Sequence, residues 1–244
     1  MRENRFFIDQ PLQSGCAVDL ERTVAVHISK VLRMTSGEQV TLFNGDGTDY
    51  IAELTVGHKQ VSATVVKTQQ NSTISPLSTE LGQGICRGDR MDYSIQKAVE
   101  MGVSSITPIV TERVQFRMDI KRLEKKMRHW QGIIIAACEQ CGRADVPLLN
   151  PVTSLSDWLT SSSHPLLTLD PLAHSSLSSA VSDMNLTRTS SVRILIGPEG
   201  GLTADEIQAS RNHGQGVSLG PRILRTETAG TAILALLQHQ LGDI

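Results

Sequence analysis

The sequence predicts an α/β protein with two parts, a small β-barrel followed by a larger domain built around a parallel sheet. Over the first stretch of about 70 residues, short strands follow one another closely, as they do in small barrels. Beyond a polar linker, apolar strand segments alternate with helical segments, which is the pattern of an α/β sheet. At 244 residues the chain can hold both parts and bury a substantial core. We place the domains at residues 1–72 and 73–244.

Turn residues divide the first part into strands. The strands are expected at Gln39–Phe43, Tyr50–Val56 and Val61–Val66. Asn44–Gly47 contains both Asn-Gly and Asp-Gly, which is a strong hairpin signal. One helix is expected over Ala25–Met34, before Ser36-Gly37. The stretch Thr68–Thr79 is rich in Ser, Thr, Gln and Asn and is interpreted as the linker.

The second part alternates between strands and helices. Strands are expected at Leu81–Cys86, Ser105–Val110, Leu166–Leu169, Val192–Ile196 and Val217–Leu219. Helices are expected at Met91–Met101, from near Asp119, at Ser154–Leu159 and from Thr226 to about Gln240. Thr203 and Glu206 have the spacing of a capping box, so another helix should begin there. Ser175–Ser191 is polar and of low complexity, and we assign it no function. By themselves these patterns predict an ordinary doubly wound sheet.

Composition limits the classes of function. The net charge is −2 and aromatic residues make up 3%, which excludes a global positive field and argues against extensive base stacking. Four cysteines in a chain of this length indicate a reducing compartment rather than a disulfide framework. The N-terminus lacks the apolar core of a signal peptide, and no apolar run approaches about 18 residues. We therefore expect a cytoplasmic protein.

A glycine-rich loop follows the apolar strand that ends at Ile196. Gly197, Gly200 and Gly201 allow close approach of a ligand to the backbone, and Pro198 stiffens the turn. The loop has neither the lysine of a Walker A motif nor the spacing of a dinucleotide fingerprint. Glu199 would also repel phosphate. The loop is either a tight turn without a ligand or a site for a ligand with little negative charge.

A second Gly-Pro loop favours the ligand. Gly220-Pro221 follows another short strand and precedes the helix expected from Thr226. Ligands of open α/β sheets bind at the carboxyl ends of the strands, so the two loops can wall one pocket. Leu166–Leu169, ending at Asp170-Pro171, is expected to supply a third loop.

The two loops resemble a known family. The stretches are Ile196-Gly197-Pro198-Glu199-Gly200-Gly201 and Leu219-Gly220-Pro221-Arg222-Ile223-Leu224-Arg225-Thr226-Glu227-Thr228-Ala229. They resemble the cofactor loops of the SPOUT methyltransferases, and more narrowly those of the ribosomal RNA small subunit methyltransferase E family. The resemblance implies a deep trefoil knot in the C-terminal domain, a PUA-like N-terminal barrel, S-adenosylmethionine as cofactor and a homodimer. It also implies methylation of N3 of a uridine in 16S rRNA of the small ribosomal subunit.

The resemblance also assigns site residues. Those implied to bind the cofactor are Leu169, Ile196, Gly197, Pro198, Glu199, Gly200, Leu219, Gly220, Ile223, Leu224 and Thr228. Methyl transfer needs the methyl group and its acceptor held in line, and the uracil N3 proton must be removed. Arg225 is the first candidate for stabilising charge on the uracil oxygens, and Glu139 is a candidate base. Asp170 is a departure from the family pattern, and no metal is expected.

Basic residues provide candidate RNA contacts. Lys30 and Arg33 share a face of the expected helix at i, i+3, and with Arg2 and Arg5 they could contact phosphates, although a solvated basic face is the alternative. The segment from His27 to Arg33 resembles the N-terminal segment of the family. The full set of candidate RNA ligands is Arg2, Arg5, His27, Lys30, Arg33, Gln140, Arg143 and Arg222. Residues 112–129 form the largest basic stretch, on or just before a helix.

Cys138 and Cys141 form a C-x-x-C pair. The pair could be half of a zinc site or a redox pair, but no second pair completes a zinc site and no thioredoxin-like pattern follows. The segment from Ala136 to Arg143 instead resembles a family segment near the active site. Two functions remain: an RNA methyltransferase, and an RNA-binding ribosome-assembly factor without catalysis. A nucleotide hydrolase is excluded because the loops lack a phosphate-binding lysine.

Overall fold

The computed structural model describes residues 4–58, 60–114 and 119–244. These residues form two compact units. One contains Met1–Ile74 together with Cys138–Val146, and the other contains Ser75–Ala137 and Pro147–Ile244. The division differs from the boundary expected at residue 72 mainly because residues 138–146 pack with the N-terminal unit.

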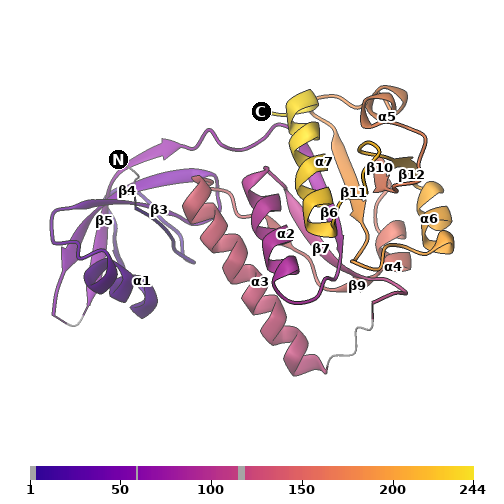
Figure 1. Cartoon of the computed structure of the whole chain (residues 1–244). Coiled ribbons are helices and arrows are strands. Elements are labelled where there is room, and N and C mark those ends of the chain that lie inside the picture. The colour runs from indigo at the N-terminus through magenta and orange to yellow at the C-terminus, as the bar shows by residue number, and fades with distance from the viewer. Residues whose placement is uncertain (1–3, 59, 115–118) are drawn as a thin grey trace. The chain divides into compact units, whose positions relative to one another are not determined.

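The N-terminal unit is a curled five-stranded sheet (Figure 1). Its strands are β1 (Arg5–Phe7), β2 (Ala17–Asp19), β3 (Gln39–Phe43), β4 (Thr48–Val56) and β5 (Val61–Gln70). The order is β1-β3-β4-β5-β2, with β1 parallel to β3 and the other pairs antiparallel. Tyr50, Ala52 and Leu54 alternate into the core from β4. The predicted Asn44–Gly47 turn joins β3 to β4, and both of its glycines have positive φ.

The helical segment of this unit begins and ends three residues earlier than expected. It consists of α1 (Arg22–Val26) followed by a π-helical turn, η1 (His27–Val31). Arg33 lies beyond the helix in the left-handed region, at φ 55°. The expectation that Lys30 and Arg33 share a helix face is therefore wrong, because the helix ends before Arg33.

The C-terminal unit is built around a parallel sheet. Its strands are β6 (Ser78–Gly84), β7 (Ser105–Val110), β8 (Leu148–Leu149), β9 (Thr153–Ser154), β10 (Leu166–Leu169), β11 (Ser191–Ile196) and β12 (Gly214–Val217). The order is β12-β10-β11-β6-β7-β8, with β9 also pairing with β7. Val192–Ile196 is buried throughout, as expected for a strand covered on both faces. The deep trefoil knot stays a prediction.

Helices cover both faces of this sheet. They are α2 (Asp89–Glu100), α3 (Ile120–Cys141), α4 (Leu155–Thr160), α5 (Leu177–Asp183), α6 (Ala204–Arg211) and α7 (Thr226–Leu241). Leu195 packs with α4, whereas the next residue, Ile196, faces Gly230 of α7. Since successive strand residues point to opposite faces, α4 and α7 lie on opposite sides. Figure 1 shows α2 beside α7.

Over the described residues, no helix is both long and apolar enough to span a membrane.

One local expectation fails in this unit. The strand expected at Val217–Leu219 lies instead at Gly214–Val217, because Gly214 pairs with Leu166 so closely that an added Cβ would overlap the Leu166 carbonyl. The polar stretch Ser175–Ser191, to which we assign no function, contains α5. Its N-terminus is capped by the Ser176 side chain, which accepts a hydrogen bond from the Ser179 amide.

A buried arginine joins β11 to α4. Arg193 is fully buried, and its guanidinium lies 4.0 Å from the centroid of the Trp158 ring. It donates to the carbonyls of Trp158, Leu159 and Ser162, the last two at 3.1 and 3.0 Å. Carbonyls at a helix C-terminus have no partner within the helix, so Arg193 caps α4 from the sheet.

Replacing Arg193 by Ala should destabilise the fold strongly. The substitution removes the Arg193 donor from the Leu159 and Ser162 carbonyls, whereas the Trp158 carbonyl keeps its bonds from Ser161. It also opens a cavity beside Trp158, and we expect the free energy of unfolding to fall by about 3–5 kcal/mol. Urea denaturation followed by tryptophan fluorescence measures this loss. The exposed Arg188 is the matched control, and its replacement by Ala should change stability by at most about 0.5 kcal/mol. Equal effects of the two substitutions would contradict the capping role.

Candidate functional site

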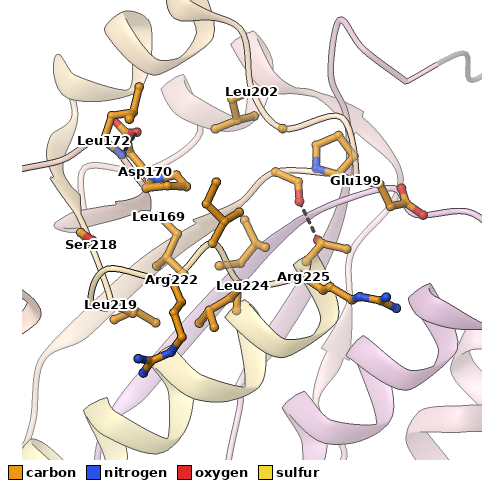
Figure 2. Close-up of a pocket in the computed structure, with 18 of the residues that line it drawn as sticks. Leu169, Asp170, Leu172, Glu199, Leu202, Ser218, Leu219, Arg222, Leu224 and Arg225 are labelled. Atoms are coloured by element: carbon orange, nitrogen blue, oxygen red, sulfur yellow. Dashed lines mark hydrogen bonds between the residues drawn. The ribbon is translucent and has the colours of Figure 1, made fainter.

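A cavity of about 680 Å³ opens at the carboxyl ends of β10, β11 and β12. We call it the strand-end cavity. Three loops supply most of its lining, as the sequence predicted for this edge of the sheet (Figure 2). The lining residues are Arg90, Leu169–Leu172, Ile196–Glu199, Gly201, Leu202, Ile207, Val217–Gly220, Arg222–Glu227 and Ala229.

Most candidate cofactor residues line this cavity. They are Leu169, Ile196, Gly197, Pro198, Glu199, Leu219, Gly220, Ile223 and Leu224, and their role as cofactor ligands stays a prediction. Arg222 and Arg225 line it too, and their side chains extend away from the apolar cluster of leucines (Figure 2). Sequence reasoning missed Arg90 and Ile207, because they come from α2 and α6 and only the tertiary structure brings them to this edge.

Two candidate cofactor residues do not line the strand-end cavity. An added Cβ on Gly200 would point at Arg113, 3.4 Å from its Cβ, so Gly200 faces the other side of its loop. Thr228 is exposed on α7, whereas Thr226 and Ala229 on the same helix are buried. The helical turn that buries Thr226 necessarily turns Thr228 outward.

The glycine-rich loop at Gly197 and the second Gly-Pro loop, which leads into α7, are tied together by one threonine. The Thr226 hydroxyl donates to the Gly197 carbonyl at 2.6 Å and accepts from Gln83 Nε2 at 3.1 Å. Gln83 is fully buried on β6. At the end of the same strand, an added Cβ on Gly84 would lie 2.6 Å from the Pro198 nitrogen, so only glycine permits this approach. The loop at Gly197–Pro198 is therefore held between β6 and the start of α7.

Charges in the strand-end cavity balance. Its lining includes the cations Arg90, Arg222 and Arg225 and the acids Asp170, Glu199 and Glu227. Asp170 is 3% exposed, forms an ion pair with Arg211 at 3.2 Å and accepts from the Leu172 amide. A lining of this kind favours a ligand with little net negative charge over a polyphosphate.

Glu199 is held on the outer side of its loop. Figure 2 shows it pointing away from Leu169 and Leu219. Its carboxylate accepts from the Arg87 amide at 2.9 Å and from Arg90 Nη1 at 3.0 Å. Burial by itself would raise the pKa of Glu199, but these hydrogen bonds outweigh it and hold the pKa below its ordinary value.

Glu139 lies in the N-terminal unit and does not line the strand-end cavity. Its Oε1 accepts a hydrogen bond from the Phe7 amide at 3.1 Å. Burial raises its pKa, although the Phe7 hydrogen bond opposes the shift. This geometry gives Glu139 a structural role, the attachment of the end of α3 to β1. Its role as a base stays a prediction.

Two candidate RNA ligands are buried in ion pairs. Arg5 Nη2 donates to Asp49 at 2.7 Å and to the Arg143 carbonyl at 3.2 Å. Arg143 is 5% exposed and its Nε donates to Asp145 at 3.1 Å. These groups fasten residues 138–146 to the sheet of the N-terminal unit, so their first function is structural.

The other candidates in this unit are exposed. They are His27, Lys30, Arg33 and Gln140, and His27 also contacts the Phe6 ring edge-on. Arg2 lies outside the described residues. RNA binding by all of these residues stays a prediction.

The C-x-x-C pair is not a disulfide. None of the four cysteines forms a disulfide, and burial raises the pKa of Cys138 to about 12. The Cys138 thiol is therefore protonated at neutral pH and is a poor nucleophile. Across the described part of the chain, no three His, Cys, Asp or Glu side chains are placed to hold a metal ion.

Comparison with known proteins identifies both parts of the chain. A family profile described as an RNA methyltransferase domain matches residues 73–238, and one described as an RNA methyltransferase PUA domain matches residues 20–66. Ribosomal RNA small subunit methyltransferase E of Buchnera aphidicola subsp. Schizaphis graminum is 34% identical, covering 98% of this chain and 97% of that protein. The chain belongs to the ribosomal RNA small subunit methyltransferase E family. The Bacillus subtilis member is 30% identical over 97% of this chain and 96% of that protein.

Solved structures agree with this family and with the SPOUT α/β fold. A putative methyltransferase from Legionella pneumophila, in complex with the cofactor S-adenosylmethionine, matches with a TM-score of 0.92 and 38% identity over 100% of both chains. A ribosomal RNA small subunit methyltransferase E from Neisseria gonorrhoeae, bound to S-adenosylmethionine, matches with a TM-score of 0.90 and 36% identity over 99% of both chains. The family thus includes a cofactor-bound relative that shares this fold.

Thr226→Val should loosen the loop at Gly197. Valine has nearly the same shape but leaves the Gly197 carbonyl and the Gln83 amide without their partner, so we expect a loss of about 1–3 kcal/mol in unfolding free energy. Chemical denaturation measures it, and Thr226→Ser, which keeps the hydroxyl, should recover most of the loss. A Ser variant as unstable as the Val variant would show that packing, not the hydroxyl, holds the loop.

Glu139→Gln should change how stability depends on pH. Because the folded pKa of Glu139 is raised, the stabilisation from its protonated form is present below about pH 4.5 and is lost as pH rises through the folded pKa. The Gln variant cannot lose a proton, so it should gain stability relative to the wild type between pH 4.5 and 7.

Glu38 provides a control because its pKa is shifted in the opposite direction to that of Glu139. Hydrogen bonds from Thr35 lower the pKa of Glu38, so its stabilisation is present above its unfolded pKa and is lost as pH falls. Glu38→Gln should therefore lose stability relative to the wild type as pH rises. Denaturation curves must extend below pH 4.5, where the Glu38 effect changes, and up to pH 7, where the Glu139 effect changes. Parallel wild-type and Glu139→Gln curves would contradict the burial of the Glu139 carboxyl.

Proposed function

We propose that this protein is an S-adenosylmethionine-dependent methyltransferase that methylates N3 of a uridine in 16S rRNA of the small ribosomal subunit. The observation that carries the proposal is the charge-balanced cavity at the ends of three parallel strands, in a chain whose relatives hold S-adenosylmethionine. The substrate and the methylated atom rest on family membership and on the resemblance of the Gly-Pro loops.

The strand-end cavity fits the cofactor. Its volume of about 680 Å³ lies within the usual range for small-molecule sites. S-adenosylmethionine carries a sulfonium, an ammonium and a carboxylate, and a lining with equal numbers of acids and bases suits that mixture. The leucine and isoleucine side chains at the strand ends offer apolar surfaces for an adenine ring. Main-chain groups at Leu169, Gly197 and Leu219 would supply hydrogen bonds to its polar edges.

The chain's own residues supply positioning and charge. When bound, the cofactor provides the electrophilic methyl group. The protein must hold the uracil in line with it and stabilise the anion left when the N3 proton is removed. Arg225 lines the cavity at the first residue before α7, and its side chain extends from the rim. We assign it the stabilisation of negative charge on the uracil oxygens, while Glu139 stays a candidate base.

The N-terminal unit is proposed to bind the RNA, as the matched PUA family suggests. Lys30 and Arg33 are exposed cations within the segment from His27 to Arg33 that resembles the N-terminal segment of the family. A homodimer and a cytoplasmic location complete the proposal. The alternative, an RNA-binding assembly factor without catalysis, is disfavoured because the cavity and its loops are intact.

Calorimetric titration tests the proposal directly. The wild-type protein should bind S-adenosylmethionine and should not bind ATP, because the lining offers no excess of cations. Arg225→Ala should keep wild-type affinity for the cofactor but transfer methyl groups to small ribosomal subunits about 10²–10³ times more slowly, since a preorganised charge contributes about that much.

Arg188→Ala serves as the control for removing one exposed positive charge, and its transfer rate should be unchanged. A wild-type rate in the Arg225 variant would remove Arg225 from the mechanism. Failure of the wild type to bind the cofactor, with and without subunits present, would leave the assembly factor as the better hypothesis.

A further inference from the structure

A second cavity lies on the other side of the glycine-rich loop that lines the strand-end cavity. It has a volume of about 540 Å³ and shares Arg90, Pro198 and Glu199 with the strand-end cavity. Gly200, which faces away from the strand-end cavity, lines this second one. The loop Pro198–Gly200 therefore separates two cavities of the same unit, and we call the second one the basic cavity.

The charge of the basic cavity is strongly positive. Its lining contains Arg87, Arg90, Arg113 and Lys126, against one acid, Glu199. The strand-end cavity, by contrast, has equal numbers of acids and bases among its described lining residues. Since the whole chain has a net charge of −2, the positive charge here is a local concentration. A cavity with such an excess attracts an anion.

The cations of the basic cavity keep most of their donors available. Arg90 uses Nη1 on Glu199, and Arg113 uses Nη1 on the Gly200 carbonyl at 2.6 Å. A guanidinium has five N–H donors in a fork that matches phosphate geometry, so each arginine can bind the wall and an anion together. Arg87 touches the wall through its main-chain amide, which leaves its exposed side chain for a ligand. Lys126 lies over the Trp130 ring, which orients its stem.

We propose that the basic cavity binds a backbone phosphate of the substrate RNA, adjacent to the nucleotide that enters the strand-end cavity. The proposal rests on the proposed function and adds the site that fixes the register of the strand. A phosphate in the basic cavity and the cofactor in the strand-end cavity contact opposite sides of one three-residue wall. Arg90 and Glu199 line both cavities. The lining also contains apolar residues, among them Ile85, Val114 and Pro198. RNA is favoured over a free nucleotide because the substrate of the proposed function carries a run of backbone phosphates, and phosphate contacts fix the register of a strand.

Neutral variants of Arg87 and Lys126 test the proposal. Arg87→Gln keeps the main-chain bond to Glu199, and Lys126→Gln keeps a polar chain over Trp130. Binding of each variant to immobilised small ribosomal subunits is measured at several salt concentrations. Each should bind about tenfold more weakly than the wild type and should lower the slope of log affinity against log salt by about 0.7–0.9. Affinity for S-adenosylmethionine should stay within about twofold, which also shows that the variants fold.

Arg188→Gln removes the same charge at an exposed residue that lines neither cavity and should change neither affinity nor slope. Unchanged slopes in both the Arg87 and Lys126 variants would overturn the proposal, as would an equal loss in the Arg188 variant, which would indicate a diffuse charge effect. The test of the phosphate site, which measures binding to subunits, can be distinguished from the test of the proposed function, which measures binding of S-adenosylmethionine. A wild type that binds subunits through Arg87 and Lys126 but never binds S-adenosylmethionine would contradict the proposed function and leave the phosphate site standing.

Discussion

The geometry of the candidate site depends on the hydrogen bond between the Thr226 hydroxyl and the Gly197 carbonyl. Glycine-rich loops have little side-chain packing of their own to fix them, so their position must come from neighbouring elements. Thr226 is the first residue of α7 and is braced by the buried Gln83 of β6. The buried Thr226 hydroxyl thus ties the loop at Gly197 to α7 and, through Gln83, to β6. The hydroxyl is costly to lose because Gln83, the group that donates to it, is fully buried and cannot pair with water instead.

The loop that Thr226 holds is also a partition. One side of Pro198–Gly200 faces a cavity with balanced charge, and the other faces a cavity with an excess of cations. Arg90 and Arg113 bind the partition through Glu199 and the Gly200 carbonyl. The loop can therefore serve two ligands of different charge without moving far. The small net charge of the chain conceals this separation, because acids elsewhere cancel the local excess.

In the N-terminal unit, arginines that would suit RNA are used to assemble the fold. Arg5 and Arg143 are held in ion pairs with Asp49 and Asp145. The bond from Arg5 to the Arg143 carbonyl and the bond between Glu139 and Phe7 attach residues 138–146 to a sheet that is distant in sequence. A charged side chain is usually solvated, so a sequence pattern assigns it to the surface by default. Only burial and pairing reveal that these arginines are internal.

The sequence by itself determined the features that depend on neighbouring residues. Buried runs such as Val192–Ile196, the hairpin at Asn44–Gly47 and the capping box of Thr203 and Glu206 all lie where they were predicted. The place of the strand-end cavity also followed, because parallel strands bring their carboxyl ends to one edge and two Gly-Pro loops lie there.

Tertiary structure decided the features that depend on pairing and burial between distant segments. It placed β12 at Gly214–Val217 through close contact with Leu166, turned Gly200 toward Arg113, and buried Arg193 under Trp158. It also brought Arg87, Arg113 and Lys126 from three separate segments to one cavity. No local pattern encodes these outcomes, because each one depends on which surfaces are close enough to exclude water and to pair the polar groups left between them.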